Sequence, residues 1–400
     1  MPNPTRIDMM DEIRTLCALP PRLPCSEGER RGHEHVASRL AALGLQPSTE
    51  PFRFQANGYA RFAAHAGLLW AAGTIGLAAP WLGTALSAAA NASFFGDLES
   101  RWFWLARLLP AGPSQNVVAR IPAAGEVRER VVLMAHVDVA REGPPLFFAP
   151  ERAKAAARFF RRELGGAPNP VQLVFWSGVA QTALQALGLA GLPTRLPQWA
   201  LAQLHAFVAL QMGRAAFSDP VPGASDDASG VAVMLAAADR LAAEPLAHTE
   251  VWVVATGCEE AMLGGALDFC DRHAPGLGAY NTWYLAIDTV GAGALRWCTG
   301  EGFLRRIPYD GKFVRLCREV AAEDGAPPAR PYTMTFATDA LVPAVRGLRA
   351  MALLALDEDD YPPNYHWHTD SPDNIDPRAL DHTLDFTLRL LRRIDADAAR

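Results

Sequence analysis

Histidine and carboxylate side chains follow apolar stretches in five segments of this sequence. The segments are AHVDV with His136 and Asp138, GASDDASG with Asp226 and Asp227, GCEEAMLGG with Glu259 and Glu260, AIDTVG with Asp288, and NYHWHTDSPDNID with His366 and His368. Each segment alone is weak evidence, because an acidic pair such as Glu259-Glu260 is most often the solvated start of a helix. Their shared position after apolar strands makes them informative.

A metal centre is the chemistry that these five segments favour together. A charged group at the end of a buried strand needs a partner. Nitrogen and oxygen ligands without thiolate suit zinc, cobalt or manganese in a catalytic site that keeps an open position for water. One bridging carboxylate can hold two such ions about 3.5–4 Å apart, with a water and a scissile carbonyl between them.

The elements that must position these side chains alternate between strands and helices. Strand patterns cover 116–121, 131–139, 249–257 and 281–291, and helical patterns cover 229–243, 262–273 and 377–398. Such alternation predicts an α/β fold, a three-layer α/β/α sandwich with a mostly parallel mixed sheet. Open sheets of this kind place their chemistry at the carboxyl ends of the strands.

Two long apolar blocks interrupt this plan. Residues 62–98 carry no charge before Asp97, and residues 171–213 carry only Arg195. Breaks at Pro80 and at 193–197 predict that each block forms a helical hairpin. We therefore expect a catalytic domain formed by residues 1–61, 99–170 and 214–400, with helical insertions at 62–98 and 171–213.

The role of the insertions stays open at this level. His136 lies between the blocks and Asp226 follows the second, so both blocks must leave and return on the same side of any membrane. Buried helices, an oligomer interface, a cap over the site and membrane-entering hairpins all satisfy this constraint. Six glutamines make the second block rather polar for lipid.

The five segments, in this order, resemble the signature segments of the di-zinc aminopeptidase family that includes bacterial leucyl-type and aminopeptidase Y-like enzymes. The resemblance covers residues 115–140 and 220–395, and it implies a zinc-exopeptidase-like fold. The sequence departs from the family pattern between His136 and Asp226, where the family has a short loop and the second apolar block stands here.

The resemblance also implies a role for each site residue. His136 and Asp288 would bind one metal, Glu260 and His366 would bind the other, and Asp226 would bridge them. Glu259 would be the general base that activates a metal-bridging water. Asp138 would orient the His136 imidazole, and the Tyr365 hydroxyl would polarise the tetrahedral intermediate. His368 is the alternative ligand if His366 does not bind the metal.

The implied function is hydrolysis of N-terminal residues from peptides with two Zn²⁺ ions per chain, or with Co²⁺ or Mn²⁺ in their place. A glutaminyl-cyclase-like acyltransferase with a single zinc is the alternative enzyme on this fold. A membrane or interaction protein on a peptidase scaffold is the non-enzymatic alternative.

Composition narrows the partners and the compartment. The net charge is −6 and the sequence has no run of Lys or Arg, so it offers no basic surface that would bind nucleic acid. The six cysteines form no C-x-x-C pair, which argues against a thiolate zinc site or a disulfide framework. The N-terminal residues lack the apolar stretch of a signal peptide. We expect a cytoplasmic or membrane-associated protein with peptide substrates, and with membrane contact or homo-oligomerisation through the insertions.

Overall fold

The computed structural model describes residues 7–164, 169–279 and 281–399. Within these residues an eight-stranded mixed sheet has the strand order β1-β2-β4-β3-β5-β10-β6-β9. Its strands are β1 (Ser48–Gln55), β2 (Ala111–Ile121), β3 (Glu129–His136), β4 (Thr249–Thr256), β5 (Thr282–Ile287), β6 (Ala294–Cys298), β9 (Arg330–Tyr332) and β10 (Arg349–Leu356). A small antiparallel pair is formed by β7 (Gly300–Glu301) and β8 (Ile307–Pro308).

The centre of the sheet is parallel. Strand β3 pairs in parallel with β4 on one side and with β5 on the other, and β5 pairs in parallel with β10. The antiparallel pairs are β1 with β2, β2 with β4, and β6 with β10. As a result, β3, β4, β5 and β10 end at the same edge.

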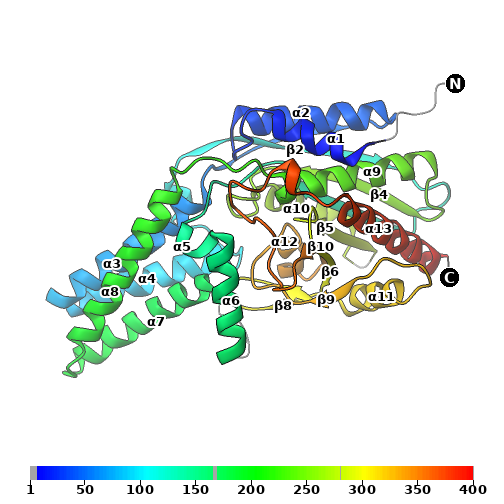
Figure 1. The fold of residues 1–400 in the computed structure, drawn as a ribbon. Helices are drawn as coiled ribbons and strands as arrows, with labels where there is room; N and C mark the ends of the chain where they lie inside the picture. Colours follow the sequence, from blue (N-terminus) through cyan, green and yellow to red (C-terminus); the bar gives the residue numbers. More distant parts are fainter. Residues whose placement is uncertain (1–6, 165–168, 280, 400) are drawn as a thin grey trace.

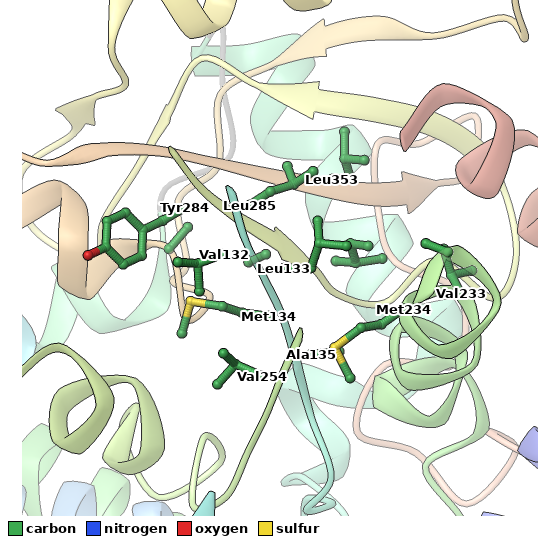
Figure 2. Close-up of a cluster of buried hydrophobic side chains, with 14 of the residues drawn as sticks. Val132, Leu133, Met134, Ala135, Val233, Met234, Val254, Tyr284, Leu285 and Leu353 are labelled. Atoms are coloured by element: carbon green, nitrogen blue, oxygen red, sulfur yellow. The ribbon is translucent and has the colours of Figure 1, made fainter. Parts of the chain in front are cut away.

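Side chains of the central strands alternate between two apolar layers (Figure 2). Leu133 and Leu285 point toward Val233 and Met234 of helix α9 (Ser229–Ala243), whereas Met134 points to the opposite face. The alternation follows from the two-residue period of a strand. All five side chains are fully buried, so the core lies on both faces of the sheet.

Helices cover both faces of the sheet (Figure 1). Helix α9 packs on β3 and contacts the neighbouring helices α1, α2 and α13, while α10 packs on β1, β2 and β4 and contacts α12. The bounds are α1 (Met9–Ala18), α2 (Glu27–Ala42), α9 (Ser229–Ala243), α10 (Gly264–Leu277), α11 (Gly311–Ala321), α12 (Leu341–Val345) and α13 (Pro377–Ala398). The predicted α/β/α sandwich is confirmed.

Both apolar blocks form helical hairpins, as predicted, and the hairpins assemble into one four-helix bundle. Helix α3 packs on α4 and α8, α4 packs on α7, and α7 packs on α8. Figure 1 shows the bundle projecting from one side of the sandwich. The helices are α3 (Gly58–Ala78), α4 (Pro80–Leu98), α7 (Pro170–Leu189) and α8 (Arg195–Ala215).

The breaks within the hairpins differ slightly from the sequence prediction. Helices α3 and α4 are separated by Ala79, with Pro80 in the first turn of α4, where proline is tolerated. Helix α8 begins at Arg195, so Pro197 lies in its first turn and not in the break. Across the described residues, none of the helices has the length and apolar character needed to cross a membrane.

The remaining helices lie between the larger elements of the fold. Between β3 and α7 lie α5 (Pro145–Phe148) and α6 (Pro150–Leu164). Single turns are η1 (Ala106–Leu108), η2 (Ala224–Ala228) and η3 (Pro372–Asn374). The turn η2 leads directly into α9 and carries Asp226 and Asp227.

Candidate metal centre

The parallel strands bring the predicted site residues to one edge of the sheet. His136 is the last residue of β3, and Asp288 directly follows β5. Glu259 and Glu260 lie in the loop after β4, and His366 lies in the loop after β10. These residues are far apart in sequence, and the shared direction of the strands makes them neighbours.

Two groups of three side chains could each hold a metal ion among the described residues. His136, Asp226 and Asp288 form one group, and Asp226, Glu260 and His366 form the other, with the ligand atoms of each group within 4.8 Å of one another. Both groups are composed of the residues that the sequence singled out. They share Asp226.

The carboxylate of Asp226 faces both groups at once. Its Oδ1 lies 3.0 Å from His136 Nε2, and its Oδ2 lies 3.4 Å from His366 Nε2. Glu260 Oε2 lies 3.1 Å from the same His366 nitrogen, and Asp288 Oδ1 lies 4.0 Å from His136 Nε2. An aspartate with one oxygen toward each group has the geometry of a bridging ligand.

Two buried aspartates hold the segment of Asp226 in place. Asp370 accepts hydrogen bonds from the backbone N–H groups of Ser225 and Asp226, at 2.7 and 3.1 Å. The carboxylate of Asp227 accepts from the backbone N–H groups of His136 and Thr289, at 3.2 and 3.1 Å. Asp227 therefore ties the ends of β3 and β5 to the segment that carries Asp226.

Asp138 contributes to the site through two different groups. Its backbone carbonyl lies 3.0 Å from His136 Nδ1. Since a carbonyl only accepts, Nδ1 carries the proton and Nε2 is free to bind a metal. Its carboxylate accepts from the backbone N–H groups of Glu259 and Glu260, both at 3.0 Å, and lies 3.8 Å from His136 Nδ1. The expected orienting role thus belongs to the backbone of Asp138, and its side chain holds the Glu259-Glu260 loop.

A residue that the sequence analysis did not single out orients the second histidine. The Tyr59 hydroxyl lies 2.9 Å from His366 Nδ1, which directs His366 Nε2 toward Asp226 and Glu260. Tyr59 is in the first turn of α3, at the start of the bundle. Its sequence neighbourhood carries no metal-site pattern, so only the fold reveals this contact.

The two other candidates in the same loop lie in different places. His368 is exposed, and its Nδ1 lies 3.1 Å from Glu142 Oε1, away from both ligand groups. Tyr365 stacks on His366 with ring centroids 4.0 Å apart, and it lines the pocket described below. The structure therefore brings His366 and Tyr365 to the centre and leaves His368 outside.

Burial and mutual charge shift the pKa values of the site carboxyls. For Glu259, burial raises the pKa well above the usual range, and the charges of Asp288 and Glu260 raise it further, while His136 opposes this. Burial likewise raises the pKa of Asp288 to about 6. For Asp226 burial acts in the same direction, but hydrogen bonds from the two histidines outweigh it and lower the pKa. So many buried carboxyls need a positive partner.

A pocket opens beside the two ligand groups. Its wall contains Glu259, Glu260 and His366, so the proposed base and two proposed ligands face the same space. The rest of the wall is largely apolar and aromatic. It includes Tyr59, Phe62, Phe148, Val171, Met262, Phe303, Phe336 and Tyr365.

The donor set fits a pair of divalent cations. Zinc binds carboxylate oxygen and imidazole nitrogen at about 2.0–2.2 Å, so its ligand atoms lie within about 4.4 Å of one another. In the two ligand groups the corresponding atoms lie within 4.8 Å of one another without an ion, which is close to this value. Glu260 Oε1 is buried without a hydrogen-bond partner among the described residues, as expected for an oxygen that faces a metal.

Comparison with known proteins agrees with this geometry. Residues 209–391 match the model of peptidase family M28. This part of the chain, which is just under half of its length, is therefore similar to peptidase family M28. The matched part includes Asp226, Glu260, Asp288 and His366, whereas His136 and the whole of α3 and α4 precede it. The comparison with curated proteins found no match for this sequence.

Solved structures with the same fold include both peptidases and cyclases. A zinc aminopeptidase from Bacillus subtilis superposes on this chain with a TM-score of 0.57 at 15% identity, covering 96% of this chain and 93% of that one. For a glutaminyl cyclase from Bacteroides thetaiotaomicron the TM-score is 0.55 at 13% identity, with 98% and 99% covered. An aminopeptidase from Aneurinibacillus sp. strain AM-1 gives 0.55 at 14% identity, with 96% and 93% covered. At these identities the likeness establishes the fold.

Proposed function

We propose that this chain is a metal-dependent aminopeptidase that removes N-terminal residues from peptides. The observation that carries the proposal is the pair of ligand groups joined by Asp226, with Glu259 beside them in the wall of the pocket. The peptidase family M28 match over residues 209–391 supports the same class of reaction.

Two divalent cations, which we propose are zinc, would be held by the two groups. His136 and Asp288 would bind one, Glu260 and His366 the other, and Asp226 both. Cobalt or manganese would fit the same nitrogen and oxygen donors. When bound, the cations supply Lewis acidity, which lowers the pKa of water and polarises the scissile carbonyl.

Glu259 is the residue that we assign to proton transfer. Its backbone is fixed by the Asp138 carboxylate, and its side chain is not part of either ligand group. Its carboxylate would accept a proton from the attacking water and deliver it to the leaving amine nitrogen as the peptide bond breaks. A carboxylate next to a ligand but not itself bound has the freedom that this transfer requires.

The pocket supports cleavage at a chain end. The bundle contributes part of its wall through Tyr59, Phe62 and Val171, at the base of α3 and α7. These side chains would limit the space beyond the N-terminal residue of the substrate. Tyr365 lines the same pocket, and we propose that its hydroxyl stabilises the developing oxyanion.

Metal content and turnover test this proposal together. The purified protein should contain two equivalents of metal and should release the aniline from aminoacyl-anilides, with loss of activity after chelation and recovery on adding zinc. Acetylation of the substrate amine should abolish cleavage. Metal-bound protein that cleaves no free-amine substrate would refute the aminopeptidase assignment.

The glutaminyl-cyclase-type reaction is the second candidate, since a cyclase from Bacteroides thetaiotaomicron shares the fold. Such an acyl transfer with a single zinc would leave one of the two ligand groups without a function. A peptide with N-terminal glutamine separates the candidates, because cyclisation releases ammonia whereas hydrolysis releases free glutamine. One metal per chain with ammonia release would favour the cyclase.

A further inference from the structure

The four-helix bundle exposes large apolar side chains on every one of its helices. Trp70 of α3 is 44% exposed, Trp81 of α4 is 67% exposed, Trp176 of α7 is 58% exposed and Trp199 of α8 is 52% exposed. The other exposed members on these helices are Leu68, Ile75, Leu86, Leu173, Leu187, Leu189, Leu196, Leu204, Phe207 and Leu210. Such a concentration of exposed apolar surface marks a binding region.

The interior of the bundle contains polar side chains among its buried apolar ones. Gln181, Gln185 and His205 are fully buried between the helices. Gln181 donates to the Leu69 carbonyl at 2.8 Å, and Gln185 donates to the Ala72 carbonyl at 2.9 Å. His205 lies 3.1 Å from Gln181 Oε1. The bundle therefore buries polar side chains while it exposes large apolar ones, whereas a water-soluble bundle turns its polar side chains toward the solvent.

Small residues allow the helices to approach closely. A Cβ on Gly83 of α4 would lie 2.2 Å from the Gly76 Cα of α3, and a Cβ on Gly178 of α7 would lie 2.9 Å from a Leu69 methyl carbon. Helices that associate without a hydrophobic driving force rely on such contacts and on interhelical hydrogen bonds. This bundle has both close contacts at small residues and hydrogen bonds between helices.

Charged residues are confined to the two ends of the bundle. At the base, Arg61 and Asp97 are buried and paired at 3.2 Å. Exposed arginines stand next to this base, at Arg101 after α4 and at Arg214 in the last turn of α8. At the far end, Arg195 donates to the Leu77 carbonyl. Between the ends, α3, α4, α7 and α8 contain no Asp, Glu, Lys or Arg.

We propose that the outer surface of this bundle is covered by the acyl chains of a lipid bilayer. The polar side chains that face inward lower the average hydropathy of each helix. In the assembled bundle they are covered, and the surface that remains exposed is apolar. A second copy of the chain would cover one face and leave the exposed tryptophans on the other helices in water. The exposed arginines at the base would meet anionic headgroups.

This placement has a consequence for the catalytic domain. Tyr59 and Phe62 at the base of α3, and Val171 at the base of α7, form part of the pocket wall. A bundle held in lipid would therefore keep the pocket close to the bilayer surface. The inference about lipid does not depend on the proposed reaction, and its test needs no substrate.

Vesicle flotation of the full-length protein tests the proposal. Protein purified in detergent would be mixed with vesicles of phosphatidylcholine and phosphatidylglycerol, freed of detergent and centrifuged in a density gradient at high salt. We expect the wild-type protein to float with the vesicles. A variant with Trp199→Glu and Leu210→Glu, both exposed on α8, should stay at the bottom.

Matched controls separate lipid binding from misfolding and from self-association. Val127→Glu introduces a charge at an exposed apolar residue of the catalytic domain and should still float. Helix content from circular dichroism should be unchanged in both variants. If the double variant fails to fold, a second measurement takes its place. Brominated phosphatidylcholine should quench the tryptophan fluorescence of the wild-type protein, and Trp176→Phe should reduce the extent of this quenching. A discrete dimer that does not float, or a wild-type monomer that stays at the bottom, would overturn the proposal.

Discussion

Replacing Tyr59 with phenylalanine removes a single hydroxyl and should weaken one metal site selectively. The hydroxyl is the hydrogen-bond partner of His366 Nδ1, at 2.9 Å. Leaving one buried polar atom unpaired costs about 1–3 kcal/mol. Partners that orient metal-binding histidines are usually worth about 10–100-fold in metal affinity, which is about 1.4–2.8 kcal/mol. We therefore expect the affinity of the site formed by Glu260 and His366 to fall by about 10–100-fold.

The assay is competition with a chromophoric chelator, which resolves the two binding steps. The site formed by His136 and Asp288 should keep its wild-type affinity, because its histidine is oriented by the Asp138 carbonyl and not by Tyr59. The control is Tyr284→Phe, since the Tyr284 hydroxyl is buried without a hydrogen-bond partner among the described residues. Equal weakening of both sites, or unchanged affinity at both, would refute the role assigned to Tyr59.

Three further substitutions test the rest of the site and the core. Glu259→Gln should retain both metals and lose at least about 10²-fold in turnover, measured with aminoacyl-anilides, because a positioned general base contributes about that much. Asp226→Ala removes the carboxylate common to both ligand groups, so elemental analysis should find less than one metal per chain. Leu133→Ala deletes a fully buried side chain in β3 and should lower the free energy of unfolding by about 2–5 kcal/mol in urea titrations.

Some properties of the bundle could be predicted from the local sequence, and others appear only in the tertiary structure. The uncharged blocks and their prolines predicted two hairpins, because charge depletion and proline position are local properties. The association of α3 with α8 and of α4 with α7 joins segments that are more than 70 residues apart in sequence. Which side chains face outward depends on that association, and so does the burial of Gln181, Gln185 and His205 between the helices.

For the metal centre, too, the sequence determined some features and the tertiary structure decided the others. The sequence by itself determined the ligand types and their position after apolar strands, and the resemblance to di-zinc aminopeptidases assigned them in pairs. Only the tertiary structure decided that the two oxygens of Asp226 face different histidines, that the backbone carbonyl of Asp138 orients His136, and that Tyr59 orients His366. Strand pattern is a local property and can be read from the chain. A hydrogen bond between Tyr59 and a histidine more than 300 residues away depends on how the bundle docks against the sheet.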